Sequence, residues 1–335
     1  MILVTGGTGL IGSHLLYQLC LQDKPVKATY RTKASLEKCR QLLELYSKDA
    51  RILFNKIQWV KADIIDIEAL QIHFDDVTEV YHSAALISFD PRDFSELMKT
   101  NQEGTANMVN LSVRNKVKKF CYVSSIAALG QGKPNTPLDE ETEWNPQYAT
   151  VYGISKFEAE LEVWRGTQEG LNVVVVNPGI VLGPGFWHSG SGLLFKLVAK
   201  QKAALLPSGT GFTSVNEVVD SMMGLMESTI VNERYILVNQ NLSYATFLKK
   251  AAEYLGVAPP KKKLSTKLLD ILWRLDWVNA NLFGKARKLT KNMVRGMQHP
   301  TEYDAKKSLE IPGFAYRNLE EEIKLCCEFY RQAHP

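Results

Sequence analysis

Short apolar runs recur through the first half of the chain, and stretches with helical spacing of apolar residues separate them. Apolar runs of this length predict buried strands. The expected strands are Ile2–Thr5, Val26–Tyr30, Ile57–Lys61, Glu79–His82, Lys119–Ser124 and Asn172–Asn177. The expected helices are Leu10–Leu21, Ala34–Tyr46, Ile67–Phe74, Asp93–Asn115 and Tyr148–Gln168. This alternation predicts an α/β fold with a doubly wound parallel sheet, whose ligands bind at the carboxyl ends of the strands.

The pattern changes after Pro178, where clusters of Gly, Pro and Ser indicate loops. Val215–Ser228 is expected to be a helix, and Arg234–Val238 a strand that rejoins the sheet. From Leu242 onward the spacing is mostly helical, with a break at Pro259-Pro260. We therefore expect two parts. Residues 1–176, with a returning segment at about 212–240, form the sheet. Residues 177–211 and 241–335 form a smaller, mainly helical part.

A glycine-rich turn follows the first expected strand, in the order Thr5-Gly6-Gly7-Thr8-Gly9-Leu10-Ile11-Gly12. A strand, a glycine-rich turn and a helix N-terminus together make a binding site for a pyrophosphate. Gly6 permits the tight turn, Gly9 lets the backbone approach the phosphates, and Gly12 lets the helix pack close to the strand. The sheet part is thus predicted to be a dinucleotide-binding Rossmann domain, and the other part to bind the substrate.

A second motif, Tyr152-Gly153-Ile154-Ser155-Lys156, lies on an expected helix. Tyr152 and Lys156 are four residues apart and share a helix face. A lysine ammonium and an oxidised nicotinamide both favour the phenolate, so we expect the pKa of Tyr152 to be lowered. Tyr152 can then donate a proton to a carbonyl oxygen or remove one from an alcohol. Ser125, directly after an expected strand, can hydrogen-bond the same oxygen.

Composition narrows the function classes. The 335 residues carry a net charge of only +4, and 45% of them are hydrophobic, so a nucleic-acid-binding protein is not expected. The five cysteines are odd in number and lack zinc-site spacing, so we expect no metal and a reduced, cytoplasmic protein. The first apolar run begins at Met1, so we expect no signal peptide. No apolar run reaches the roughly 20 residues of a membrane-spanning helix.

These motifs, with Asp63, His82-Ser83-Ala84-Ala85, Asn101 and Tyr122-Val123-Ser124-Ser125, resemble an extended short-chain dehydrogenase/reductase of the NAD-dependent epimerase/dehydratase superfamily. Val26–Arg31 and Asn177–Gly185 resemble its dihydroflavonol-reductase-like and 3-beta-hydroxysteroid-dehydrogenase-like members. The resemblance implies a triad of Ser125, Tyr152 and Lys156, with Asn101 supporting a proton relay. It implies that Lys156 also holds the nicotinamide ribose and that Asp63 contacts adenine. Further cofactor contacts are expected from Gly6, Thr8, Gly9, Leu10, Ile11, Gly12, Ile64, Ala84, Ala85 and Pro178.

Simpler roles remain open for three of these residues. Asp63 could cap a helix that begins near Ile64, and Asn101 could be an ordinary surface helix residue. For His82 we favour a structural role over a catalytic one.

The expected reaction is reduction of a carbonyl, a ketone or aldehyde, of a small hydrophobic substrate. The alternative is a nucleotide-sugar epimerase or dehydratase on the same fold. Such enzymes typically grip the substrate pyrophosphate with an arginine after a Gly-x-Gly segment, and Gly209–Ser214 contains none. A non-catalytic NADP-binding regulator is less favoured because Tyr152 and Lys156 are both present.

NADP is expected in preference to NAD, which remains the alternative. An acid at the end of the second strand would bind the ribose 2′-hydroxyl of NAD. Here Arg31 occupies that region and Lys33 follows two residues later. A guanidinium matches the geometry of a 2′-phosphate.

The sequence gives weaker evidence for partners other than the small-molecule substrate, and a homodimer is left as an alternative. Lys261-Lys262-Lys263 precedes Leu264–Phe283, a stretch with amphipathic spacing. This stretch could lie on a membrane surface. We favour the alternative, a helix of the substrate part that covers the pocket. The pocket walls are expected in the loops Leu86–Phe89, Ala128–Gln131 and Phe186–Ser191.

Overall fold

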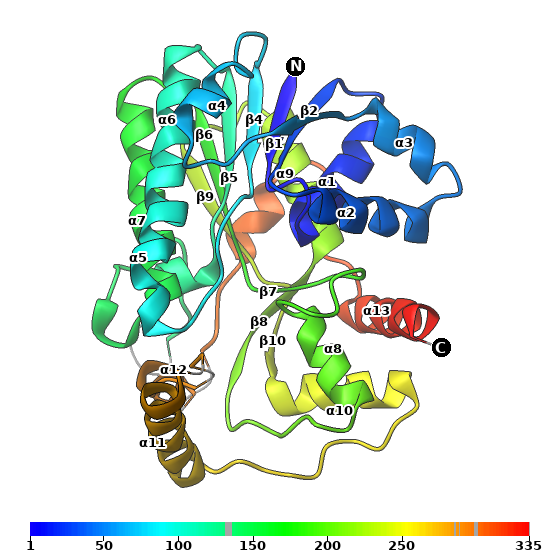
Figure 1. Ribbon diagram of the computed structural model, residues 1–335, viewed down its shortest axis with the longest axis vertical. Coiled ribbons are helices and arrows are strands. Elements are labelled where there is room, and N and C mark those ends of the chain that lie inside the picture. The colour runs from blue at the N-terminus through cyan, green and yellow to red at the C-terminus, as the bar shows by residue number, and fades with distance from the viewer. Residues whose placement is uncertain (131–135, 285, 288, 298–300, 335) are drawn as a thin grey trace.

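The computed structural model describes residues 1–130, 136–284, 286–287, 289–297 and 301–334. Figure 1 shows a central sheet with helices on both faces and a smaller part below it. The strands are β1 Ile2–Thr5, β2 Val26–Tyr30, β3 Gln58–Lys61, β4 Glu79–His82, β5 Lys119–Val123, β6 Val173–Pro178, β7 Ile180–Leu182, β8 Gly209–Ser214, β9 Glu233–Leu237 and β10 Gln240–Ser243. The helices are α1 Leu10–Leu21, α2 Lys33–Tyr46, α3 Ala50–Lys56, α4 Ile67–Gln71, α5 Phe94–Leu97, α6 Gly104–Arg114, α7 Val151–Gln168, α8 Gly192–Ala199, α9 Val215–Glu227, α10 Tyr244–Leu255, α11 Thr266–Phe283, α12 Lys291–Gly296 and α13 Leu319–Ala333.

The large sheet is parallel, in the order β3-β2-β1-β4-β5-β6-β9. This confirms the expected doubly wound α/β fold, and each expected strand lies within one residue of its observed bounds. The strand predicted to rejoin the sheet is β9, which pairs with β6 through Val176 and Tyr235. The strand order reverses between β1 and β4, and open sheets of this kind bind ligands at that point.

Side chains of alternating direction fill a core on each face of the sheet. In β6, Val174 and Val176 join one core and Val173 and Val175 join the other. The first core contains Leu15 and Leu19 of α1, and the second contains Met108 of α6, Ala159 of α7 and Val163 of α7. A strand buried on both faces reads as a continuous apolar run, which is why the sequence pattern located these strands.

A second, three-stranded sheet in the order β10-β8-β7 lies in the smaller part, and the sequence pattern did not predict it. β8 pairs antiparallel with β10 and parallel with β7. Its sequence contains Gly209 and Gly211, which are typical of loops, and β7 is only three residues long. α8, α10 and α13 pack against this sheet around Phe212 and Phe247.

Two helix predictions were wrong in detail. The expected helix Asp93–Asn115 is divided into a 3-10 turn, α5, a π segment at Met98–Glu103, and α6. α3 was not predicted, because its seven residues show too little periodicity. Among the described residues, no helix combines the length and the apolar character that crossing a bilayer requires.

Candidate active site

The glycine-rich turn lies at the switch point of the sheet. Gly6 has a φ of +70°, and a Cβ on it would lie 2.6 Å from the Ala84 nitrogen in the loop after β4. A Cβ on Gly12 would lie 2.2 Å from the Gly6 carbonyl oxygen. Gly9 is the N-cap of α1 and offers no side-chain cap. The amide groups in the first turn of α1 are therefore available to phosphate oxygens.

α7 packs closely on the segment that follows β5. A Cβ on Gly153 would lie 2.7 Å from the Ala127 carbonyl oxygen, so only glycine allows this approach. The Thr150 hydroxyl accepts from the Gly153 amide at 3.0 Å and starts the helix. The Ser125 hydroxyl accepts from the Ala127 amide at 3.1 Å, which leaves its own hydrogen for another acceptor. This packing brings Ser125 and Tyr152 together.

The electrostatics of Tyr152 differ from the expectation. Burial raises its pKa to about 12, and the nearby Ser125 hydroxyl lowers it only in part. The Lys156 side chain donates to Tyr122 and Val123. The protein side chains alone therefore keep Tyr152 as a neutral phenol, which is a proton donor.

Lys156 is buried and has two partners from β5. Its Nζ donates to the Tyr122 hydroxyl at 2.6 Å and to the Val123 carbonyl oxygen at 2.8 Å. Desolvation lowers the pKa of Lys156 to about 7, and Glu160 acts in the opposite direction. Tyr122 is thus the side chain that holds Lys156.

Glu160 and Asn177 connect α7 to the backbone of Ser125. The Asn177 side-chain amide donates to Glu160 Oε1 at 2.6 Å and to the Ser125 carbonyl oxygen at 3.1 Å. Arg234 of β9 lies 3.6 Å from Glu160 Oε2. Burial raises the pKa of Glu160, and Arg234 and Lys156 lower it. Asn177 therefore ties the backbone of Ser125 to the helix that carries Tyr152.

His82 has the structural environment favoured from the sequence. Its ring nitrogens lie 2.6 Å from the Thr5 hydroxyl and 3.0 Å from the Thr105 hydroxyl. The ring stacks on Tyr122 at 5.6 Å. Desolvation lowers its pKa to about 3, so His82 is neutral near pH 7.

Asn101 is buried rather than on the surface. Its side-chain oxygen accepts from the Leu86 amide at 2.7 Å, and its nitrogen donates to the Leu86 carbonyl oxygen at 3.0 Å. The same nitrogen donates to the Ser155 hydroxyl at 2.8 Å, and that hydroxyl donates to the Tyr152 carbonyl oxygen at 2.9 Å. Asn101 therefore positions the Leu86 loop and the start of α7, while the proton relay stays a prediction.

The expected adenosine end of the cofactor site lies at the carboxyl ends of β2 and β3. Arg31 is exposed, and its Nη1 lies 3.8 Å from a carboxylate oxygen of Asp63. Lys33 is exposed at the first position of α2. Asp66, not Asp63, caps α4 by accepting from the Ala69 amide at 3.0 Å.

The other expected cofactor residues differ in exposure. The side chain of Ile64 is buried in the second core, and Pro178 is buried at the end of β6. Leu10, Ile11 and Ala84 are half-buried, and Ala85 is exposed. For Ile64, therefore, only the backbone can contact a ligand, because the side chain is buried.

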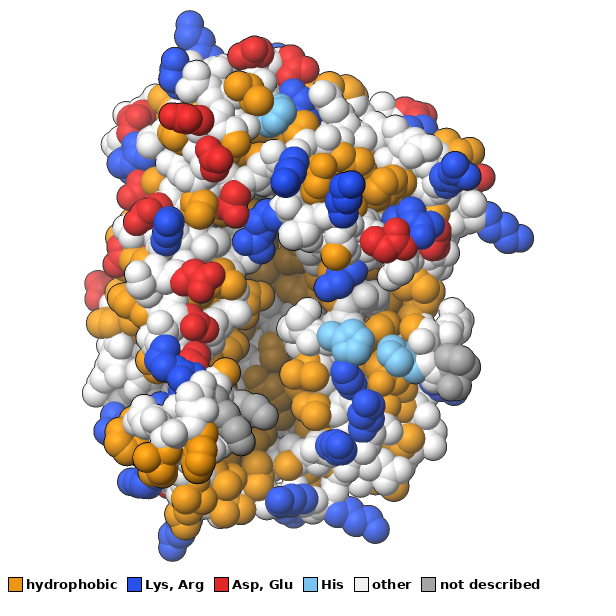
Figure 2. Space-filling view, viewed as in Figure 1, with side chains coloured by type: hydrophobic (Ala, Val, Ile, Leu, Met, Phe, Trp, Pro, Cys, Tyr) orange, Lys and Arg blue, Asp and Glu red, His pale blue; other side chains and the backbone are white. Residues whose placement is uncertain are grey.

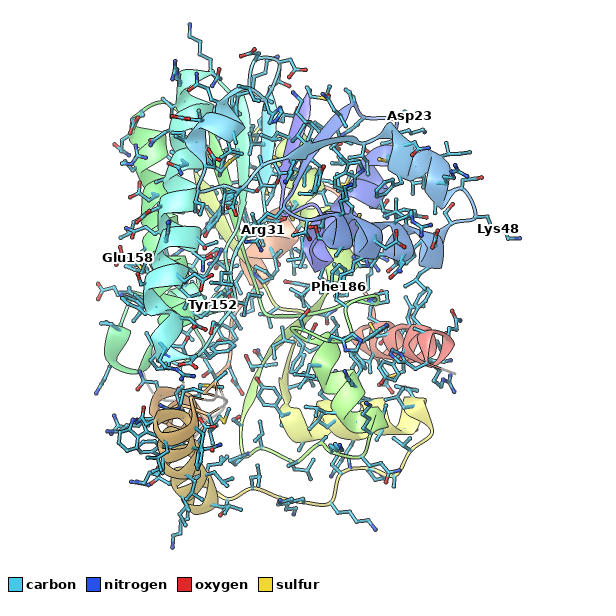
Figure 3. The ribbon with its side chains drawn as sticks, viewed as in Figure 1. Asp23, Arg31, Lys48, Tyr152, Glu158 and Phe186 are labelled. Atoms are coloured by element: carbon cyan, nitrogen blue, oxygen red, sulfur yellow. The ribbon has the colours of Figure 1, made fainter. Side chains whose placement is uncertain are left out.

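A pocket of about 220 Å³ opens next to Thr150 and Val151, the residues that precede Tyr152, and Tyr152 itself is not among its lining residues. Its lining includes Phe89, Pro91, Val151, Trp273, Trp277 and Arg287. The ring of Phe89 meets that of Tyr152 edge-on at 5.7 Å. Figure 2 shows the molecule hollowed between its two parts, with hydrophobic side chains on the floor. In Figure 3, Arg31, Tyr152 and Phe186 lie around this central region.

The pocket walls were predicted only in part. Phe89 was in an expected loop, and α11 contributes two tryptophans as the covering helix we favoured. Gln131 lies outside the described residues. Tyr122 and Glu160 were missed, although inward alternation in β5 and the spacing of four residues after Lys156 were available as signals. In the part of the chain that the structure describes, no group of three His, Cys, Asp or Glu side chains could hold a metal.

A family model described as the NAD dependent epimerase/dehydratase family matches residues 2–236. The chain belongs to this family. It is an NAD(P)-dependent enzyme of the extended short-chain dehydrogenase/reductase type, as the sequence motifs indicated.

Proteins with different named activities resemble the chain. A putative dihydroflavonol 4-reductase of Synechocystis sp. is 25% identical over 332 residues, covering 96% of this chain and 91% of the relative. Sterol demethylase protein B of Methylococcus capsulatus is 24% identical over 280 residues, covering 80% and 78%. The crystal structure of a UDP-glucose 4-epimerase from Thermotoga maritima with UDP-glucose has a TM-score of 0.78 at 22% identity, covering 100% of this chain and 99% of that chain. The likeness to this structure concerns the fold.

Proposed function

We propose that this family member reduces a carbonyl, a ketone or aldehyde, of a small hydrophobic substrate by hydride transfer from NADPH. The observation that carries the proposal is the aromatic pocket beside Tyr152. Phe89 contacts the Tyr152 ring directly, and Trp273 and Trp277 line the same pocket from α11. The lining is mainly apolar and aromatic, although Thr150, Thr290, Lys291 and Asn292 also belong to it, and such a pocket favours an apolar substrate.

Two cationic residues, Arg287 and Lys291, line this pocket, and Arg287 is already engaged. Arg287 Nε donates to Asp276 at 2.9 Å, and its Nη2 donates to the Leu289 carbonyl oxygen at 3.0 Å. A guanidinium engaged in this way is poorly placed to bind the pyrophosphate of a nucleotide sugar. The engagement of Arg287 therefore supports the reductase over the epimerase or dehydratase.

The proposed chemistry uses three side chains. Tyr152, a neutral phenol, donates its proton to the carbonyl oxygen, and the Ser125 hydroxyl hydrogen-bonds the same oxygen. Lys156, fixed by Tyr122 and Val123, favours the phenolate left behind. A bound NADPH supplies the hydride to the carbonyl carbon.

NADP is proposed as the cofactor because the cationic side chains lie where its 2′-phosphate is expected. Arg31 and Lys33 are exposed after β2, and the partner of Arg31 is Asp63 at the long distance of 3.8 Å. A phosphate offers a guanidinium a stronger, paired acceptor than this carboxylate. Gly6, Thr8, Gly9 and Gly12 would hold the pyrophosphate on α1.

The two parts of the molecule divide this work. We assign the dinucleotide to residues 1–176 with about 212–240, and the substrate to residues 177–211 with 241–335. The pocket residues Trp273 and Arg287 belong to the second group, whereas Phe89 and Val151 reach it from the first.

The test is a comparison of NADPH and NADH oxidation by the purified chain over a panel of aromatic and alicyclic ketones and aldehydes. We expect NADPH consumption with hydrophobic carbonyls and loss of that activity in Tyr152→Phe. UDP-glucose tested in parallel separates the alternative. Interconversion of UDP-sugars without net consumption of nicotinamide, and no turnover of any ketone, would overturn the reductase proposal.

A further inference from the structure

α11 exposes an apolar face to solvent. Five of its aliphatic residues are 36% to 72% exposed. They are Leu268, Ile271, Leu275, Val278 and Leu282. Their spacing of three and four residues places them on one side of the helix as a continuous stripe. We call these five residues the α11 stripe.

The α11 stripe points away from the protein. The buried residues of the helix are Leu269 and Ala280, and Trp273 turns toward the pocket. At 3.6 residues per turn, these three positions lie on the side opposite the stripe. In Figure 1, α11 stands at the edge of the molecule beside α12. A helix on the surface of a water-soluble domain usually presents its polar side outward, so this helix is inverted.

Positive charge is concentrated around the same helix. Residues 261–295 contain ten Lys and Arg but only two Asp and Glu, a net charge of +8. The whole chain carries +4, so the rest of it carries −4. Lys261, Lys262 and Lys263 are exposed just before α11. A backbone bridge between Leu205 and Lys263 fixes this lysine run against the smaller part.

Two cations also flank the α11 stripe within the helix. Lys267 and Arg274 are exposed, and they are seven residues apart, so they lie along one edge of the stripe. Figure 2 shows hydrophobic side chains at the lower left, where α11 lies in Figure 1, with Lys and Arg side chains around them. An apolar stripe with a basic border is the pattern of a helix that lies in a membrane interface.

We propose that the α11 stripe docks this protein on the surface of an anionic lipid membrane. The five aliphatic side chains enter the boundary between headgroups and acyl chains, and the lysine run contacts anionic headgroups. The charge decides between this occupant and a second copy of the chain. A two-fold interface would set one +8 segment against another, which is repulsive. An anionic lipid surface has the complementary sign.

The docked orientation has a consequence for the substrate, which rests on the proposed function. The pocket lies on the inner side of the same helix, since Trp273 and Trp277 line it. Docking through the α11 stripe brings the pocket close to the bilayer. The substrate class that follows is a carbonyl compound dissolved in the membrane.

Co-sedimentation of the full-length protein with lipid vesicles tests the docking itself. We expect binding to vesicles of 70% phosphatidylcholine and 30% phosphatidylserine, and weaker binding as salt rises. Leu275→Glu with Leu282→Glu should weaken binding by at least about tenfold. The triple change of Lys261, Lys262 and Lys263 to Ala should weaken it on the order of 100-fold on these vesicles. Pure phosphatidylcholine vesicles should show little effect of that triple change.

Ile72→Glu is the matched control, because Ile72 is 71% exposed and Leu282 is 72% exposed. This control should bind vesicles like the wild type, and all variants should keep their thermal unfolding temperature. Absence of binding by the wild type, or equal binding by the Leu275/Leu282 variant, would overturn the proposal. Light scattering that shows a wild-type dimer and a monomeric Leu282→Glu variant, with no vesicle binding, would assign the face to a homodimer instead. None of these readouts uses catalysis, so failure of the reductase proposal is seen separately.

Discussion

The Lys156 ammonium and the Tyr122 hydroxyl lie 2.6 Å apart in the interior of the protein, and the same ammonium also lies near the Tyr122 ring, 4.3 Å from its centroid. The lysine of the proposed triad is therefore held by a side chain of β5 before any ligand contact is considered. Thr105 and His82 lie behind Tyr122 and complete a buried polar row. Such a row fixes the lysine Nζ in one position.

Tyr122→Phe should weaken the interactions that hold the Lys156 Nζ in place. The change removes one acceptor of a buried ammonium, and a hydrogen bond to a charged group contributes about 1.5–3 kcal/mol. The loss of unfolding free energy should be larger at pH 6, where Lys156 is charged, than at pH 9, because its pKa is about 7. Urea unfolding at both pH values measures it. Tyr81→Phe is the control, since Tyr81 is buried in the core on the other face of the sheet. Equal losses at the two pH values would contradict the role of Tyr122.

Tyr152→Phe should remove the proton donor and leave the cofactor site nearly unchanged. General acid–base catalysis contributes roughly 100- to 10,000-fold, so kcat should fall within that range. Stopped-flow reduction of the best ketone measures kcat, and fluorescence titration measures the Kd for NADPH. Near-normal turnover by the variant would remove Tyr152 from the mechanism.

Arg31→Ala should weaken NADP binding by about tenfold or more and leave NAD binding nearly unchanged, because charge-assisted hydrogen bonds contribute about 1.5–3 kcal/mol. Calorimetric titration of both cofactors gives the two dissociation constants. Arg40→Ala is the control, because Arg40 lies in the following helix α2 and is paired with Glu37. If the Arg31 variant loses affinity for both cofactors equally, Arg31 does not bind the 2′-phosphate.

Gly153→Ala should separate Tyr152 from Ser125. The new Cβ would lie 2.7 Å from the Ala127 carbonyl oxygen, so α7 must move. Overpacking of this kind costs about 1–3 kcal/mol of stability, and kcat should fall more than KM changes. Gly296→Ala in α12 is the control, since among the described residues outside its own helix turn no atom lies within 4 Å of its added Cβ. A fully active Gly153 variant would show that the close approach is not needed.

Acid should destabilise the protein through two buried histidines. Desolvation lowers the pKa of His82 to about 3 and that of His14 to about 4. Below pH 6.5 the unfolded chain binds protons that the folded protein does not, so unfolding free energy falls as pH falls toward these values. Each group contributes up to about 1.4 kcal/mol per pH unit. His82→Gln should make the dependence between pH 6.5 and 4.5 shallower by that amount, and the exposed His334→Gln should not. An unchanged slope for His82→Gln would contradict the neutral state of that ring.

The sequence located what depends on short-range pattern. The strands of the large sheet are apolar runs buried on both faces, and β6 shows this most clearly with its four consecutive valines. The glycine-rich turn and the Tyr152–Lys156 spacing are likewise local. The second sheet was missed because the glycines of β8 resemble a loop, and its strand character comes from pairing with β7 and β10.

The partners of the site residues depend on long-range packing. Tyr122 lies 34 residues before Lys156, and nothing local indicates that their side chains meet. Trp273 enters the pocket from a helix more than 100 residues after Tyr152. The pKa of Tyr152 was expected to be lowered by Lys156 and an oxidised nicotinamide, whereas in the protein alone burial raises it.

The π segment Met98–Glu103 changes the direction in which the side chains of α5 point relative to those of α6. A π turn holds about one more residue than an α turn, so side chains before it are turned by roughly 100° relative to an uninterrupted helix. α6 keeps its apolar face on the sheet through Met108 and Val109, while α5 contacts α7 and the 3-10 turn Pro91–Asp93, whose Pro91 lines the pocket. Asn101 lies in this π segment and accepts a hydrogen bond from the Leu86 amide. Deletion of a single residue from the π segment would therefore rotate α5 relative to α6, although every side chain of both helices would be unchanged.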